Sequence, residues 1–123
     1  MLTLPSVDEA TGQLSHQLLP LNSDSILNAS HTGTVVLVDT SGSSVQVTMP
    51  SVSEVENSSI YFTLVAGSNA LDIVGQDSDT VDSSSNGIRT TTQWSVVLLR
   101  ALDSNWAVDR EAGTWTTITT TTT

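Results

Sequence analysis

The fold is decided by residues 60–108, which read IYFTLVAGSNALDIVGQDSDTVDSSSNGIRTTTQWSVVLLRALDSNWAV. Short apolar runs alternate there with Gly, Asn, Asp and Ser, which are the residues that favour turns. Each run has the length of a β-strand, and none is long enough for a stable helix. This stretch therefore predicts several short strands joined by tight turns.

The same pattern continues upstream. Residues 34–39, TVVLVD, are apolar on both faces, which predicts a strand that is covered on both sides. Residues 44–49, SVQVTM, alternate between polar and apolar side chains, as a half-buried strand does. Residues 40–43 separate the two runs and include Gly42. We expect an antiparallel hairpin here, with Gly42 at a positive φ.

The composition also favours β-structure. Ser and Thr number 19 each among 123 residues. Thr is frequent in strands and Ser in turns, and this chain length suits one domain. Strands at short spacing with turns between them are typical of sandwiches and jelly rolls. We predict an all-β fold, an antiparallel β-sandwich or jelly-roll-like knob with extended N- and C-terminal arms.

Three segments follow from this interpretation. Residues 1–13 form an N-terminal arm, because Pro5 and Gly12 break any periodicity. Residues 14–109 form the β-sandwich core, and Pro20 suggests that it begins with an edge strand or a connector. Residues 110–123 form a Thr-rich C-terminal arm with strong β-propensity and no partner within itself. We expect this arm to pair with another molecule.

The charge excludes several classes of function. The chain has no Lys and only three Arg against thirteen Asp and Glu, which gives a net charge of −10. Binding to nucleic acid or to an anionic membrane requires clustered cations, so neither is expected as a partner. The absence of cysteine excludes disulfides and thiolate metal sites. The N-terminal residues do not resemble a signal peptide, and no stretch reaches transmembrane length.

No catalytic motif is visible in the sequence. His16 and His31 are the two histidines, and neither lies in a metal-binding or triad-like motif. We interpret both as surface or loop residues. The chain is therefore predicted not to be an enzyme and to need no cofactor.

The acidic loop at residues 76–87 carries the spacing D-x-D-x-x-D, formed by Asp77, Asp79 and Asp82. Carboxylates at this spacing are a candidate Ca²⁺ site, because Ca²⁺ prefers oxygen ligands. The Gly and the Glu that an EF-hand loop requires are both missing. We prefer the alternative, a solvated acidic turn.

The three tryptophans offer a different kind of site. Trp94 and Trp106 have apolar neighbours, which indicates packing in the core or at a subunit interface rather than a sugar-binding platform. Trp115 lies in the polar C-terminal arm, where it has no core of its own, and is the candidate anchor in a neighbouring subunit. The other candidate partner-binding residues on the two arms are Leu2, Leu4 and Ile118.

Six successive segments resemble small trimeric bacteriophage virion domains, which occur in head decoration (cement) proteins and in fibre tips. The resemblance covers roughly half of the chain and departs from the pattern at Ser83–Asn86, where the family usually turns at once on Gly. In order, the segments are VQVTMP (45–50), IYFTLV (60–65), ALDIVG (70–75), Asp79–Asp82, TTQWSVVLL (91–99) and Ser104–Trp106.

The resemblance implies a homotrimer without enzymatic activity. The preferred expectation is a capsid decoration (cement) protein on the outer surface of a phage head, which binds the major capsid protein and neighbouring trimers and stabilises adjacent capsomers. The arms would add strands to the sheets of those partners. The alternative is a tail- or head-fibre tip that recognises a host surface glycan. The residues expected at the trimer interface are Val36, Val38, Val97 and Leu99.

Overall fold

The computed structural model describes residues 6–8, 13–15 and 17–119. The prediction of an all-β chain is confirmed, since the described residues form strands, turns and short 3-10 helices. The strands of the first half are β1 (Ser6–Asp8), β2 (Gln13–Ser15), β3 (Leu18–Leu21), β4 (Ser25–Ile26), β5 (Val35–Asp39), β6 (Val45–Thr48) and β7 (Ser59–Ala66). Those of the second half are β8 (Leu71–Val74), β9 (Thr80–Val81), β10 (Ile88–Thr90), β11 (Val96–Leu102), β12 (Asn105–Ala112) and β13 (Thr116–Thr117). The 3-10 helices are η1 (Ala29–His31) and η2 (Val52–Glu54).

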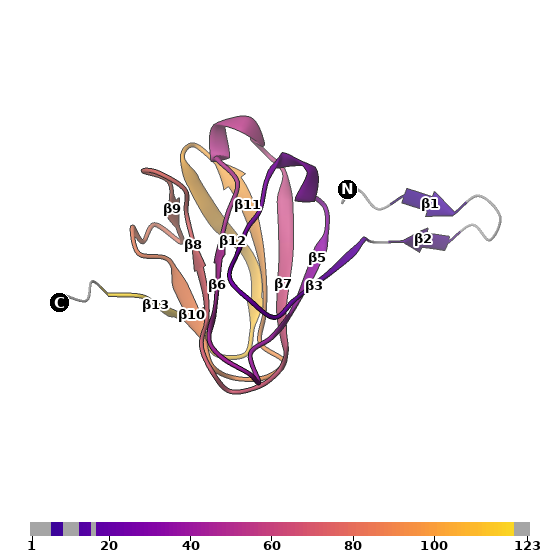
Figure 1. Cartoon of the computed structure of the whole chain (residues 1–123). Coiled ribbons are helices and arrows are strands. Elements are labelled where there is room, and N and C mark those ends of the chain that lie inside the picture. The colour runs from indigo at the N-terminus through magenta and orange to yellow at the C-terminus, as the bar shows by residue number, and fades with distance from the viewer. Residues whose placement is uncertain (1–5, 9–12, 16, 120–123) are drawn as a thin grey trace.

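Two sheets face each other as layers (Figure 1). One is six-stranded, in the order β3-β5-β7-β11-β12-β9, and the other is five-stranded, in the order β13-β10-β8-β6-β4. The small hairpin β1–β2 lies away from both layers, on the side of β3 and β5 (Figure 1).

The first half of the chain winds like a solenoid. Successive strands from β3 to β8 alternate between the two sheets, so that β3, β5 and β7 are parallel in one sheet and β4, β6 and β8 are parallel in the other. The second half pairs mostly antiparallel, β11 with β7 and β12, and β10 with β8 and β13. The short strand β9 is the exception, since it pairs parallel with β12. The expected antiparallel sandwich is thus wrong for residues 18–74, although the two-layered β-core is present.

The corner at residues 40–44 explains the difference. The chain leaves β5 in one sheet and enters β6 in the other, so the expected hairpin does not form. Thr40 Oγ1 donates to the Asn69 carbonyl oxygen at 2.9 Å, and Asn69 Nδ2 donates to the Thr40 carbonyl oxygen at 2.7 Å. These bonds stack this corner on the next one, between β7 and β8. Gly42 has no positive φ; Gly67, in the stacked corner, has a φ of 96°.

The interior is one continuous apolar cluster between the sheets. Trp106, the largest side chain in it, is fully buried, as predicted, and its Nε1 donates to the Pro50 carbonyl oxygen at 3.2 Å. The predicted trimer-interface residues are also 0% exposed within the single chain, so they cannot form a surface between subunits. That assignment is corrected for Val36, Val38, Val97 and Leu99.

The first and last long strands of the two layers are β3 and β12. β3, with Pro20, is an edge strand of the six-stranded sheet, as predicted. At the other end β12 continues through Ala112, because residues 110–112 pair with residues 96–98 of β11. The predicted boundary at residue 110 therefore falls inside a strand.

Replacement of Gly67 by Ala is expected to destabilise the fold. A Cβ at this position would collide with the backbone of Thr40 and Ser41, and the φ of 96° is unfavourable for a residue with a side chain. We expect the free energy of unfolding to fall by about 1–3 kcal/mol. Gly42→Ala is the matched control, since nothing lies within 4 Å of its Cβ position. Urea denaturation of both variants measures the difference, and an equal effect of the two would contradict the stacked-corner geometry.

Candidate binding surface

The outer side of the six-stranded sheet is the main apolar surface of the described chain. Side chains alternate across a strand, so the burial of Val36 and Val38 turns their neighbours Val35 and Leu37 outward. The same alternation operates along β3, β7 and β11. We call the outward set the apolar face; it consists of Leu18, Pro20, Val35, Leu37, Tyr61, Val65, Val96 and Leu98.

The strand register places these side chains in two rows across the sheet. From β3 to β12, the first row joins Leu18, Val35, Tyr61, Leu98 and Arg110. The second row joins Pro20, Leu37, Thr63, Val96 and Ala112. Neighbours in a row lie about 5 Å apart, so the apolar side chains form a continuous surface.

The apolar face is partly accessible to solvent. The described chain forms two layers, so no third layer covers the outer side of the six-stranded sheet (Figure 1). Leu18 is 59% exposed and Pro20 is exposed, whereas the other six members of the face are half-buried. A contiguous apolar surface on a small acidic domain marks a site of interaction.

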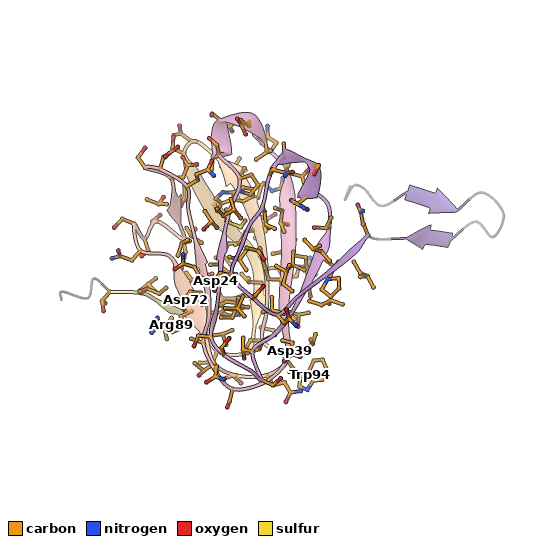
Figure 2. All side chains as sticks on the ribbon, in the orientation of Figure 1. Asp24, Asp39, Asp72, Arg89 and Trp94 are labelled. Atoms are coloured by element: carbon orange, nitrogen blue, oxygen red, sulfur yellow. The ribbon has the colours of Figure 1, made fainter. Side chains whose placement is uncertain are left out.

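The outer side of the five-stranded sheet is polar by contrast. Gln46 and Thr48 point outward from β6, and Arg89 on β10 binds Asp72 on β8 through bonds of 2.6 and 2.8 Å. This ion pair raises the pKa of the Arg89 guanidinium above its usual value. Figure 2 labels the pair on this sheet and Trp94 at the lower end of the molecule. The two outer faces therefore differ in chemistry.

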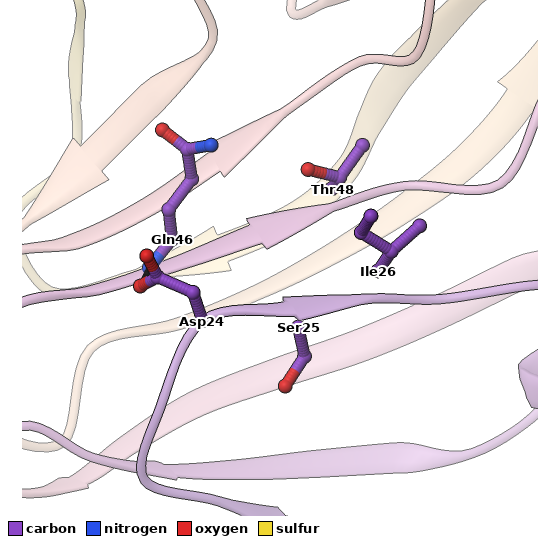
Figure 3. Close-up of a pocket in the computed structure, with 5 residues that line it drawn as sticks. All are labelled: Asp24, Ser25, Ile26, Gln46 and Thr48. Carbon is purple, nitrogen blue, oxygen red and sulfur yellow. Dashed lines mark hydrogen bonds between the residues drawn. The ribbon is translucent and has the colours of Figure 1, made fainter.

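A shallow depression lies on the polar side, between β4 and β6 (Figure 3). Ile26, which is 70% exposed, lies beside Thr48 in it, and Asp24 Oδ1 accepts the Gln46 backbone N–H at 2.8 Å. The acceptor atom of Asp24 already has this partner, and a single exposed isoleucine offers little apolar area. This depression is a weaker candidate than the apolar face.

Trp94 lies at the end of the apolar face rather than in the core. It is 65% exposed and has a φ of 72°, which is unusual for a bulky residue. Its backbone N–H donates to the Leu64 carbonyl oxygen at 2.6 Å, and Gln93 Nε2 donates to the Val65 carbonyl oxygen at 2.9 Å. These bonds fix the turn against β7, so the indole is held at the surface by a rigid backbone.

The structure does not assemble the candidate calcium site. Within the described residues no three His, Asp or Glu side chains lie together as metal ligands. Asp79 Oδ2 instead accepts the Val52 N–H at 2.8 Å, which ties the acidic loop to η2. Asp77 and Asp82 are exposed turn residues at positive φ. The D-x-D-x-x-D spacing reflects turn formation here.

His31 has a structural contact. Its Nδ1 accepts the Asn28 N–H at 2.9 Å, while Asn28 Oδ1 accepts the Ser30 N–H, and together these bonds cap η1. His16 lies outside the described residues.

The C-terminal anchors bind within the chain. Trp115 Nε1 donates to the Val96 carbonyl oxygen at 2.9 Å, and its ring packs against the core. The Ile118 N–H donates to the Gly87 carbonyl oxygen at 2.8 Å, and β13 pairs with β10. The expectation that this arm lacks an internal partner is wrong for residues 115–118. Leu2 and Leu4 lie outside the described residues.

Comparisons with known proteins add no relative. No family model matches the chain, and no curated protein is significantly similar to it. The described residues contain no helix that is long and apolar enough to cross a membrane.

Trp115→Phe is expected to loosen the C-terminal segment. The variant keeps an aromatic ring but loses the bond to the Val96 carbonyl oxygen, at a cost of about 1 kcal/mol in unfolding free energy. Amide exchange at Ile118, whose N–H depends on the docked segment, should accelerate. Trp94→Phe is the control, because that ring is exposed. Unchanged exchange in Trp115→Phe would show that the tail is held by other contacts.

Asp39 should titrate below an ordinary aspartate. The Ser41 hydroxyl and the Ser41 N–H both donate to Asp39 Oδ1, and these bonds lower the pKa of Asp39. Because the folded pKa is the lower one, the bonds favour folding above the unfolded pKa and are lost as the pH falls through the folded pKa. Carboxyl NMR titration should show the pKa of Asp39 rising in Ser41→Ala and unchanged in Ser43→Ala. An unchanged pKa of Asp39 in Ser41→Ala would contradict this assignment.

Proposed function

We propose that this chain is a structural virion protein, a homotrimeric decoration protein that binds the outer surface of a phage head and stabilises adjacent capsomers. The observation that carries the proposal is the apolar face, a surface on a small acidic domain that suits contacts between the subunits of a homotrimer. The resemblance in residues 45–106 supplies the virion context.

Rigidity supports a structural function. The stacked corners and the fully buried core give a scaffold that holds its outer faces in fixed positions. The charge of −10 supports it too, because densely arrayed copies with acidic outer surfaces repel one another and remain soluble.

The placement of the terminal segments suits a protein that bridges neighbours. The hairpin β1–β2 lies on the side of β3, whereas β13 lies on the opposite side of the molecule (Figure 1). Segments that leave a body in different directions can contact different partners, and three copies per trimer add avidity to weak contacts. Because residues 115–118 are docked on their own chain, the N-terminal segment is the better candidate for the capsid contact.

Addition of the purified protein to phage heads that lack it tests this function. We expect saturable binding seen by cryo-electron microscopy on the outer head surface, and greater resistance of the heads to heat. Deletion of residues 1–15 should abolish occupancy while leaving the core folded. The matched control is Gln46→Glu on the polar sheet face, which should bind normally. Absence of binding by the intact chain would refute the proposal.

A second function is favoured by Trp94. An indole that is 65% exposed on a rigid turn can stack on a sugar ring, as a fibre tip that recognises a host glycan requires. Glycan-array binding that is saturable and lost in Trp94→Ala would support this alternative over decoration. Heads that lack the protein should then be as stable as complete ones, but the particles should adsorb poorly.

A further inference from the structure

We propose that the apolar face is the contact between copies of this chain, with three copies packing these faces around a common axis. This inference rests on the proposed homotrimer and names the surface that forms it. It assigns the subunit contact to the side chains that alternate with the buried ones, Val35, Leu37, Val96 and Leu98, rather than to the buried ones themselves.

The apolar character of the face favours its burial against another protein surface. The first row presents aliphatic or aromatic side chains on four neighbouring strands, and the second row presents them on both sides of Thr63. Removal of such side chains from water is favourable, so covering this sheet face would stabilise the protein further. The polar outer face of the other sheet has no such requirement.

Charge indicates that the occupant is a second copy. A basic partner would be attracted to the acidic loops of a chain with a net charge of −10. A second copy carries the same charge and can approach closely only through a surface that is free of net charge. The eight side chains of the apolar face carry no charge, and the charged residues that alternate onto the same side, Asp39 on β5 and Arg100 on β11, have opposite signs. This side is therefore suited to self-association.

The charges at the border of the face agree with this. Arg100 binds Asp109 through bonds of 2.7 and 2.8 Å, which neutralises both at the β11–β12 side. Arg110 is exposed at the end of the row that contains Tyr61 and Leu98. A cation at the rim of an uncharged face can bind an acidic residue of a neighbouring copy, which supplies thirteen of them.

Trp94 supplies an anchor at one end of the face. Its turn is fixed to β7, so little conformational freedom is lost when the exposed indole becomes covered. Rigid aromatic side chains surrounded by apolar neighbours dominate the energetics of many interfaces. Tyr61, in the centre of the first row, is a second aromatic in the same surface.

Strand addition at the β3 edge, one of the four edges of the two described layers, is a poorer route to association. β3 is the edge strand, and the Val35 N–H donates to the Gln17 carbonyl oxygen, so residues 17, 19 and 21 point their backbone groups toward β5. The backbone groups of Leu18 and Pro20 then point away from β5, and Pro20 has no N–H to donate. The edge is protected against pairing, whereas the face remains available.

Two threonines allow a matched test. Thr63 lies in the second row of the apolar face, on β7, and Thr48 points outward from the polar sheet, on β6; both are half-buried. Sedimentation equilibrium of the intact chain should show a trimer. Thr63→Lys should weaken association by at least about 100-fold, because it places a charge inside the contact. Thr48→Lys should remain trimeric, with circular dichroism confirming that both variants fold.

Crosslinking gives a readout that does not depend on stability. The chain has no cysteine, so Thr63→Cys and Thr48→Cys each introduce a single thiol. A short bis-maleimide should join copies of Thr63→Cys and not of Thr48→Cys. Equal crosslinking of the two, an unaffected trimer in Thr63→Lys, or a monomeric intact chain would each overturn the inference.

Failure of this interface and failure of the proposed decoration function give different results. If the intact chain binds heads as a monomer, this interface is refuted but head binding is not. The same holds if the intact chain binds heads and the Thr63→Lys variant remains a trimer. If the intact chain is a trimer that Thr63→Lys dissociates, the interface is supported. If that trimer does not bind heads, the decoration function is refuted.

Discussion

The parallel register of stacked strands is the constraint on which the rest of this molecule depends. It places Leu19, Val36 and Phe62 side by side in the interior, and β11 extends the row with Val97. Because side chains alternate along a strand, a shift by one residue would exchange the interior for the surface on every strand. The hydrogen-bonded corners at Thr40 and Asn69 resist such a shift, since their bonds form in one register only.

The same constraint creates the difference between the two outer faces. Where β5 and β11 are buried through Val36 and Leu99, their equally apolar neighbours are forced outward. β6 and β8 carry Gln46, Thr48 and Asp72 at the corresponding positions, and Val74 is the apolar exception. The outer side of the five-stranded sheet is thus mostly polar, apart from Ile26 and Val74, and that of the six-stranded sheet is mostly apolar. This asymmetry supports the proposed contact between copies through the apolar face.

The ends of the chain show where local sequence information stops. A Thr-rich tail that contains one tryptophan has no partner in its own neighbourhood of the sequence, which favoured an intermolecular arm. Folding brings Trp115 to the Val96 carbonyl oxygen, about 20 residues away in the sequence. It brings Ile118 to the Gly87 carbonyl oxygen, about 30 residues away. Pro20 was more informative, because a missing N–H has a local consequence that holds in any fold: it belongs at an edge.

The sequence by itself determined the all-β class, the approximate positions of most strands, the burial of Trp106 and the edge position of β3. These follow from apolar period, turn residues and proline chemistry, which act over a few residues. Only the tertiary structure decided that the strands from β3 to β8 stack in parallel coils, and which side of a doubly apolar strand faces inward. TVVLVD has no preference between its two faces, so the choice depends on the strands that pack beside it.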